Sequence, residues 1–447
     1  MSGAPEGAGP AYCLDPVARV GGELQVPGDK SISHRALMLG GISAGRTEIS
    51  GFLESGDCLA TLAALRALGV GIEQGGAGHV AVNGVGLAGL HASPRPLDMG
   101  NAGTAMRLSM GLLCAQPFSS TLIGDASLMQ RPMERVAKPL RLMGARIDTR
   151  DGRPPVILHG GAALSGIDYA MPMASAQVKS AILLAGLQAR GTTRVSEPAP
   201  TRDHTERMLR GFGATVERRG ATVELVGGQR LRGTAVRVPG DFSSAAFFIV
   251  AGCLAAPAGL TVRGVGVNPT RTGLLDMLRL MGADITVALI PDAGPEPVAD
   301  ITVRASALHG AVIPPQLVPL AIDELPVLFI AAACASGETV VTGAEELRVK
   351  ESDRLAAMAE GLGAVGAQCQ LLPDGLRIQG GVIRGGRVRS HGDHRIAMSF
   401  AVASVRAREV IAIDEVANVG TSFPGFPEAA RRIGLALRES PEPSGRV

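Results

Sequence analysis

The sequence has no tryptophan, and its 447 residues include only two tyrosines and ten phenylalanines. With 46% hydrophobic residues, its cores must therefore be built mainly from Ala, Val, Leu and Met. The 60 glycines predict many tight turns, because glycine adopts backbone conformations that other residues avoid. A chain of this length predicts about two or more domains.

The sequence also lacks a charge excess, paired cysteines and long apolar runs. Its net charge of +2 gives no basic field of the kind that nucleic-acid-binding proteins use. The six cysteines lie far apart, without a CxxC pair, which favours reduced thiols over a disulfide frame or zinc site. No apolar run is long enough to span a membrane, and the first 16 residues lack the features of a secretory signal. We predict a soluble cytoplasmic protein that binds neither nucleic acid nor membrane and holds no metal.

Two patterns recur six times along the chain. The first is a helix end in which Leu-Arg, two further residues and then Gly-Ala or Gly-Val follow one another. The match to this pattern is weaker in the last two copies. Its glycines, where helices are predicted to end, are Gly69, Gly144, Gly213, Gly282, Gly363 and Gly434. The second pattern is a polar cap before an apolar helix of small residues. The predicted caps are Ser31, Asn101, Ser175, Ser243, Asp323 and Asp393, spaced by about 70 residues.

Each repeat reads as helix, strand, helix and then paired strands, which makes the chain an α/β protein. The sixth repeat stops at Leu435–Leu437 without strands after its second helix, so we expect the N-terminal segment Val17–Val26 to complete it. Val-Pro-Gly-Asp occurs at 26–29 and 238–241, three repeats apart, and predicts two crossings between domains. One domain is then 29–240, and the other is 241–447 completed by the N-terminal strands 15–28.

A solenoid is the structural alternative for such repeats. The predicted first helices are apolar all round, as in Ala181–Ala185 and Ala245–Val250, which predicts burial inside each domain instead. Buried helices that run alike aim their N-termini at one face, and such a face favours anions.

Polar residues are concentrated at these helix starts. The stretch Gly28–Arg35 places Lys30, Ser31, His34 and Arg35 at the start of an apolar helix, whose dipole repels cations, so it indicates an anionic ligand. Similar groups occupy 101–107, 130–132, 175–179, 201–204, 323–324, 349–354 and 393–395. Each group alone is explained as an ordinary cap or a solvated face. Together, cations with two or three carboxylates predict a site for a multiply anionic substrate and proton transfer.

These stretches match the motifs of a known family, in order and over nearly the whole chain. The matching segments are Gly28–Arg35, Gly100–Arg107, Arg131–Pro132, Ser175–Gln177, Thr201–His204, Asp323–Pro326, Lys350–Arg354 and Gly392–Ala397. They resemble the 5-enolpyruvylshikimate-3-phosphate synthases, and segments 175–177 and 201–206 resemble the glyphosate-tolerant branch. The resemblance implies a two-domain inside-out α/β barrel built from six βαβαββ-type repeats, three per domain.

The resemblance also implies the reaction. The 5-hydroxyl of shikimate 3-phosphate attacks C2 of phosphoenolpyruvate, C3 is protonated, and phosphate leaves a tetrahedral intermediate. The residues implied for phosphoenolpyruvate are Lys30, Gly103, Arg131, Gln177, Arg354 and Arg395. Those implied for shikimate 3-phosphate are Lys30, Ser31, Arg35, Ser175, Ala176, Gln177, Arg202, Asp323 and Lys350. Asp323 would accept the hydroxyl proton, and Glu351 or Lys30 would move the proton at C3.

The sequence departs from the family pattern at two places. Many members carry a Lys just before a C-terminal Phe-Pro, whereas this chain reads Gly420-Thr-Ser-Phe-Pro424, so one contact to the phosphate is missing. Position 103 is Gly where the tolerant branch often has Ala, which would leave room for glyphosate.

Features of the sequence oppose two other functions. The related UDP-N-acetylglucosamine enolpyruvyl transferases carry a reactive Cys in the loop that here reads Asp125–Pro132, without Cys. A non-catalytic repeat scaffold is opposed by the acid and base candidates Asp323 and Glu351 among arginines. We expect small-molecule substrates, no cofactor and a monomer.

Overall fold

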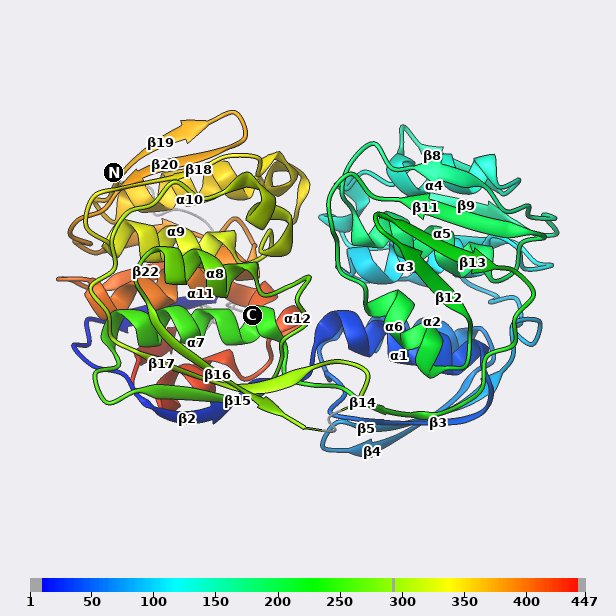
Figure 1. Ribbon diagram of the computed structural model, residues 1–447, viewed down its shortest axis with the longest axis horizontal. Coiled ribbons are helices and arrows are strands. Elements are labelled where there is room, and N and C mark those ends of the chain that lie inside the picture. Colours follow the sequence, from blue (N-terminus) through cyan, green and yellow to red (C-terminus); the bar gives the residue numbers. More distant parts are fainter. Residues whose placement is uncertain (1–9, 292–293, 441–447) are drawn as a thin grey trace, which may run out of the picture. The chain divides into compact units, whose positions relative to one another are not determined.

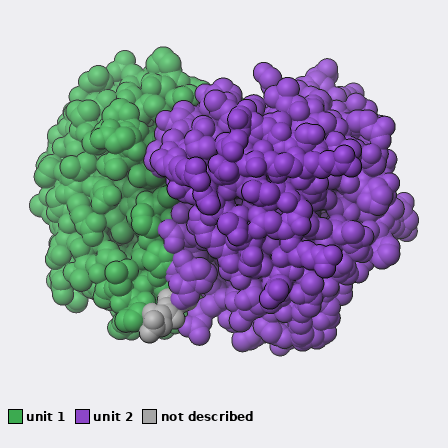
Figure 2. All heavy atoms as spheres, turned by 45° about the vertical axis from the view of Figure 1, so that its right-hand side comes forward, with its two compact units in different colours: residues 1–27, 240–292, 297–447 green, residues 28–239, 293–296 purple. Residues whose placement is uncertain are grey.

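The computed structural model describes residues 10–291 and 294–440. These residues form two compact units (Figure 2). Unit 1 takes in 10–27, 240–291 and 297–440, and unit 2 takes in 28–239 and 294–296. The chain therefore passes from unit 1 to unit 2 after Pro27 and returns after Pro239.

Unit 2 contains three four-stranded sheets. In sheet order, their strands are β14 (Ala235–Arg237), β3 (Ala44–Ser50), β5 (His79–Val85) and β4 (Gly71–Gly76); β6 (Leu97–Asp98), β7 (Ser120–Ile123), β9 (Arg153–His159) and β8 (Arg146–Arg150); β10 (Asp168–Ala170), β11 (Thr192–Ser196), β13 (Thr222–Val226) and β12 (Val216–Arg219). The first strand of each sheet pairs in parallel with the second, and the other neighbours are antiparallel. Because β14 is the last strand of the unit and pairs with β3, its first, the unit closes on itself.

Helices of unit 2 fall into inner and outer sets. They are α1 (Lys30–Ile42), α2 (Gly56–Ala67), α3 (Gly103–Leu113), α4 (Glu134–Leu142), α5 (Ala176–Gly186) and α6 (His204–Gly211). The inner helices α1, α3 and α5 are buried along nearly their whole length and fill the core. They are rich in Ala, Gly and Leu, whose small or compact side chains let helices approach closely on all sides. Figure 1 shows α3 beside α5.

Unit 1 contains two four-stranded sheets and one three-stranded sheet among its described residues. In sheet order, the strands are β16 (Asp284–Ile290), β17 (Val298–Arg304), β15 (Leu260–Gly266) and β2 (Gly22–Gln25); β18 (Glu338–Val341), β20 (Gly375–Gln379) and β19 (Gln368–Leu372); β21 (Gly386–Arg389), β22 (Ile411–Asp414), β1 (Ala11–Asp15) and β23 (Ala436–Ser440). The N-terminal strand β1 lies between two C-terminal strands and pairs antiparallel with both.

Three inner helices fill the core of unit 1 as well. Its helices are α7 (Phe242–Ala255), α8 (Gly273–Leu280), α9 (Leu325–Cys334), α10 (Arg354–Ala364), α11 (His394–Ala403), α12 (Val419–Ser422) and α13 (Phe426–Arg432). Helices α7, α9 and α11 lie side by side (Figure 1). Every residue of α7 and α11 is buried, which agrees with their apolar sequences.

The structure corrects three details of the repeat pattern. A strand, β23, does follow the last helix, where the sequence predicted none; it was missed because it is short and its outward residues are charged. The predicted segment Val17–Val26 forms a strand only at β2, and β1 lies before it. Gly363 does not end its helix, because α10 continues to Ala364 and the left-handed residue is Gly366. The other five predicted glycines have positive φ, as helix ends of this kind require.

The mixed α/β class predicted from the sequence is confirmed. Within the described residues, none of the helices is both long and apolar enough to cross a membrane.

Candidate active site

The predicted site residues lie at the starts of helices. In unit 2, Lys30, Ser31 and Arg35 belong to α1, Gly103 begins α3, Ser175 to Gln177 begin α5, and Arg131 and Arg202 shortly precede α4 and α6. In unit 1, Asp323 precedes α9, Lys350 and Glu351 precede α10, Arg354 begins α10, and Arg395 belongs to α11. A helix start offers free N–H groups and the positive end of the helix dipole, so these positions favour anionic groups.

Several helices begin earlier or later than the predicted caps. Asp29 caps α1, since its carboxylate accepts a 2.9 Å bond from the backbone N of Ile32. Asp241 caps α7 in the same way, accepting from Ser243 N at 2.7 Å. Both aspartates end a Val-Pro-Gly-Asp segment, and a charged oxygen at a helix start competes better than the hydroxyl of a following serine.

Of the four remaining predicted caps, two are confirmed and two are not. Ser175 and Asp393 cap α5 and α11 through their side chains, as predicted. Ala102 and Glu324 occupy the cap positions of α3 and α9, without a side-chain capping bond, in place of the predicted Asn101 and Asp323. Asn101 and Asp323 are instead used in contacts with arginines, described below.

Lys30 pairs with a carboxylate that the sequence did not single out. Its Nζ lies 3.0 Å from Asp57 Oδ2, and the two side chains are 17% and 9% exposed. Asp57 stands in the first turn of α2, where the helix dipole stabilises a carboxylate. The ammonium of Lys30 is thus held between two helix starts in unit 2.

Arg35 is a buried cation whose acceptors are neutral. Its Nε donates to Thr205 Oγ1 at 2.7 Å, its Nη2 to Ser180 Oγ at 2.9 Å and its Nη1 to the Ser31 carbonyl at 2.9 Å. Burial lowers the pKa of Arg35 to about 10, and the carboxylate of Glu206 acts in the opposite direction. The guanidinium therefore stays charged at neutral pH and retains its attraction for an anion.

A second group of contacts fixes Gln177 against α3. Its Oε1 accepts from Arg107 Nη1 at 2.5 Å, and its Nε2 donates to Thr104 Oγ1 at 2.9 Å. Arg107 also donates to the carbonyl of Pro132 at 3.2 Å. Arg107 lies in one of the predicted polar segments, but no role is predicted for it from the sequence; its position six residues after the predicted cap Asn101 is the signal that points to it.

Gly103 lies beneath two guanidinium groups. A Cβ built on Gly103 would meet Nη1 of Arg131 at 3.1 Å and Nη1 of Arg107 at 3.5 Å. Arg131 donates in turn to Asn101 Oδ1 at 2.5 Å. An alanine at 103 would therefore press on the guanidinium of Arg131.

Arg354 in unit 1 is surrounded by carboxylates. Its Nε lies 2.8 Å from Asp393, its Nη2 lies 2.6 Å from Glu351, and its Nη1 lies 3.3 Å from Asp323. The side chain is 1% exposed. Burial acts to lower the pKa of Arg354, but the carboxylates of Asp393, Glu351 and Asp323 outweigh it and raise that pKa above its usual value. The acid and base candidates predicted for unit 1 thus share one guanidinium.

Two more cations adjoin Asp323. Lys350 Nζ lies 3.6 Å from Asp323 Oδ1, and Arg395 Nη1 donates to the Asp323 carbonyl at 3.0 Å. All five residues predicted in unit 1 therefore form a single connected group around Asp323 and Arg354. Asp393, the cap of α11, joins this group as a residue whose contact with Arg354 the sequence did not predict.

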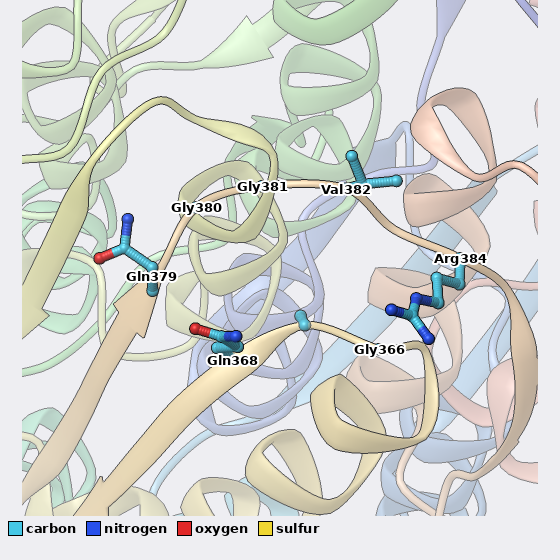
Figure 3. Close-up of a pocket in the computed structure, with 8 residues that line it drawn as sticks. Gly366, Gln368, Gln379, Gly380, Gly381, Val382 and Arg384 are labelled. Carbon is cyan, nitrogen blue, oxygen red and sulfur yellow. The ribbon is translucent and has the colours of Figure 1, made fainter.

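Two hollows of unit 1 lie apart from these residues. One, of about 250 Å³, is bordered by Gln368 and Gln379 at the ends of β19 and β20, by Gly380 and Gly381, and by Arg384 (Figure 3). The other, of about 300 Å³, is lined mainly by the segment 416–428, with Tyr12 of β1 among its other residues. Neither is lined by a residue of the predicted site.

Metal-ligand groupings and the thiol of Cys114 are the remaining features to place among the described residues. Among residues 10–291 and 294–440, no three His, Cys, Asp or Glu side chains are grouped so as to hold a metal ion. Cys114 ends α3 in the core, and burial raises its pKa to about 12, so it stays a protonated thiol at neutral pH.

Comparisons with known proteins agree with the resemblance seen in the sequence. The family model described as EPSP synthase (3-phosphoshikimate 1-carboxyvinyltransferase) matches residues 14–429. A 3-phosphoshikimate 1-carboxyvinyltransferase of Alkalilimnicola ehrlichii is 60% identical over 428 residues, covering 95% of this chain and 96% of the relative. Its counterpart in Acidithiobacillus ferrooxidans is 58% identical over 426 residues, covering 95% of this chain and 98% of the relative.

A solved structure gives the same answer for the fold. The EPSP synthase from Acinetobacter baumannii superposes with a TM-score of 0.86 at 53% sequence identity, covering 96% of this chain and 100% of that one. The family predicted from the sequence motifs is therefore confirmed, and with it the expectation of an enzyme. The chain belongs to the EPSP synthase (3-phosphoshikimate 1-carboxyvinyltransferase) family.

Proposed function

We propose that this enzyme transfers the enolpyruvyl group of phosphoenolpyruvate to the 5-hydroxyl of shikimate 3-phosphate and releases phosphate, a step in aromatic amino acid biosynthesis. The observation that carries the chemistry is the group around Arg354, where one buried guanidinium joins the carboxylates of Asp323 and Glu351. Both substrates are anions, and the reaction moves protons, so cations and carboxylates are needed together.

The addition step is assigned to residues of both units. Asp323 accepts the proton of the 5-hydroxyl while the oxygen of this hydroxyl bonds to C2 of phosphoenolpyruvate. C3 takes a proton from Glu351 or Lys30, which gives a tetrahedral intermediate that still carries the phosphate. In the elimination step the C2–O bond to phosphate breaks and C3 returns its proton to Glu351 or Lys30, so phosphate leaves and the enol ether forms.

Shikimate 3-phosphate is assigned to residues at the starts of α1 and α5 and to others that lie close before α6, α9 and α10. Ser31 and Arg35 hold its carboxylate, and Ser175 with Arg202 and Lys350 hold its 3-phosphate. The remaining residues assigned to it are Lys30, Ala176, Gln177 and Asp323. Support for the carboxylate assignment comes from Arg35. Its guanidinium is charged, and the acceptors of its three hydrogen bonds are all neutral.

Phosphoenolpyruvate is assigned to Lys30, Gly103, Arg131, Gln177, Arg354 and Arg395. At Arg354 we expect an incoming oxygen to compete with Asp323 and Glu351, because these carboxylates accept from Nη1 and Nη2. Displacement removes a cation from the side of the released carboxylate and so raises its affinity for a proton. Binding of the second substrate would thereby prepare the acid–base groups for the addition step.

The finer architecture is also a proposal. We infer a two-domain inside-out α/β barrel of six βαβαββ-type repeats, with domains 29–240 and 241–447 completed by strands 15–28. It is supported by the three sheets and three inner helices of each unit, and by the changes of unit after Pro27 and Pro239. The monomeric state and the cytoplasmic location stay predictions.

Release of phosphate from phosphoenolpyruvate tests the function directly. We expect release with shikimate 3-phosphate and none with UDP-N-acetylglucosamine. Release with the nucleotide sugar instead would assign the related transferase activity, and no release with either would favour a non-catalytic scaffold.

A further inference from the structure

Unit 2 contains a lysine whose side chain is entirely buried among charges. Nζ of Lys179, in the first turns of α5, lies 2.9 Å from Glu197 Oε1 and 2.7 Å from Glu206 Oε1. The three side chains are 0%, 1% and 2% exposed. Arg218 Nη1 approaches the same Glu197 oxygen at 3.0 Å. Apolar replacements of buried ion pairs are often neutral or stabilising, so such a cluster is weak grounds for a role in stability alone.

The cluster holds the segment that carries Arg202. Glu197 accepts from both the backbone N, at 3.0 Å, and the hydroxyl of Thr201, the residue before Arg202. Lys179 adds a 3.4 Å bond to the Thr201 carbonyl. The loop before α6 is therefore tied to α5 through Lys179, which stands two residues after Gln177.

The same cluster adjoins the cradle of Arg35. Lys179 and Ser180 are neighbours on α5, and Thr205 and Glu206 are neighbours on α6. Lys179 and Glu206 form an ion pair between the two helices. The hydroxyls of Ser180 and Thr205 lie 2.7 Å apart, and both accept hydrogen bonds from Arg35. A shift of α6 against α5 would thus move both acceptors of that guanidinium.

We propose that Lys179 is a positioning residue for shikimate 3-phosphate. Lys179 fixes the position of Arg35 through Glu206 and the position of Arg202 through Glu197. It also fixes the start of α5, because it belongs to the first turn of that helix. This inference rests on the substrate assignments proposed above. It also predicts selectivity, because the phosphoenolpyruvate residue Arg131 is held by Asn101. Gln177, which both substrates share, is held separately by Arg107 and Thr104 of α3.

Replacement of the lysine tests the proposal. Lys179→Met keeps an unbranched side chain that is one atom shorter and removes its charge. We expect the KM for shikimate 3-phosphate to rise about tenfold, which corresponds to about one charge-assisted hydrogen bond, while the KM for phosphoenolpyruvate stays within about twofold. Arg194→Met is the matched control, because Arg194 also bridges two carboxylates of unit 2, Asp168 and Glu224, but with an exposed side chain. It should leave both KM values unchanged.

Glu206→Gln is the second variant, for the case that Lys179→Met does not fold. It retains the Lys179–Glu197 pair, and we expect it to raise the KM for shikimate 3-phosphate severalfold. Lys179→Arg should restore most of the affinity lost in Lys179→Met. Equal changes in both KM values, or no change in either folded variant, would overturn the proposal.

Arg35→Met separates the two levels of the inference. If Arg35→Met raises the KM for shikimate 3-phosphate but the folded Lys179 and Glu206 variants do not, only the positioning role is wrong. If Arg35→Met leaves that KM unchanged, the substrate assignment is wrong and the positioning role falls with it.

Discussion

Replacing Arg354 by lysine should damage catalysis far more than it damages the fold. The lysine keeps a positive charge near Asp323, Glu351 and Asp393, but its single nitrogen cannot reproduce three separate donor directions. Asp393 also retains bonds from Ser352 Oγ at 3.1 Å and from the backbone N of Arg395 at 2.9 Å. We therefore expect the free energy of unfolding to fall by about 1–3 kcal/mol, the usual cost of one unsatisfied buried acceptor.

The effect on the reaction is larger because two charge-assisted bonds to substrate are lost. At about 1.5–3 kcal/mol each, they amount to about 3–6 kcal/mol of transition-state binding, or a loss of about 10²–10⁴ in kcat/KM for phosphoenolpyruvate. Steady-state phosphate release at saturating shikimate 3-phosphate measures this loss, and urea unfolding measures stability. Arg387→Lys is the control, since Arg387 makes a two-point pair with Asp414 on the surface of the same unit. A folded Arg354→Lys enzyme with kcat/KM within about threefold of the parent would refute the assignment.

Three further changes test other parts of the site. Lys30→Ala should abolish turnover while leaving the circular dichroism spectrum unchanged, because Asp57 keeps a helix start to stabilise it; an active variant would overturn the role of Lys30. Gly103→Ala adds a methyl 3.1 Å from a guanidinium nitrogen of Arg131, and we expect a larger rise in the inhibition constant of glyphosate than in the KM for phosphoenolpyruvate; equal rises would contradict this. His34 has a pKa that burial and then the charges of Lys30 and Arg35 lower to about 3, so the folded protein excludes the proton that an unfolded histidine binds below about pH 6.5. Stability is thus lost as pH falls from about 6.5 towards 3, and His34→Gln should recover about 2 kcal/mol at pH 5 relative to pH 7.5 in urea titrations; an unchanged difference between the two pH values would contradict it.

The sequence predicts the inner helices well because their signals are local. Apolar runs such as that of α7 are read directly from neighbouring residues, and the same holds for five of the six glycines that end outer helices. The helix starts are predicted less accurately where an aspartate lies two residues before the predicted cap, as Asp29 does before Ser31. There the choice depends on which oxygen reaches a free N–H group, which is a matter of backbone geometry.

Counter-ions were the main omission at the candidate site. Asp57 and Lys30 are 27 residues apart, and Asp393 and Arg354 are 39 residues apart, so no local pattern connects them. Each of these carboxylates stands at the start of a different helix from its partner, and only the packing of the helices brings the charges together. A resemblance to a family can name the substrate-facing cations, but the residues that fix those cations depend on the fold of each unit.

Two of the buried arginines, Arg35 and Arg354, show why these partners matter for the reaction. Arg35 donates to two hydroxyls and a carbonyl, so a substrate carboxylate that reaches it adds a charge-assisted bond without breaking an ionic one. Arg354 is already paired with three carboxylates, so an anion that binds there competes with them for the same guanidinium. The first arrangement favours tight binding of a substrate, because a buried charge gains its counter-ion. The second gives less binding energy, but it transfers the change in charge to Asp323 or Glu351, where the proposed mechanism needs a base. We infer that differences in the counter-ions, and not in the arginines themselves, assign one cation to holding a substrate and the other to catalysis.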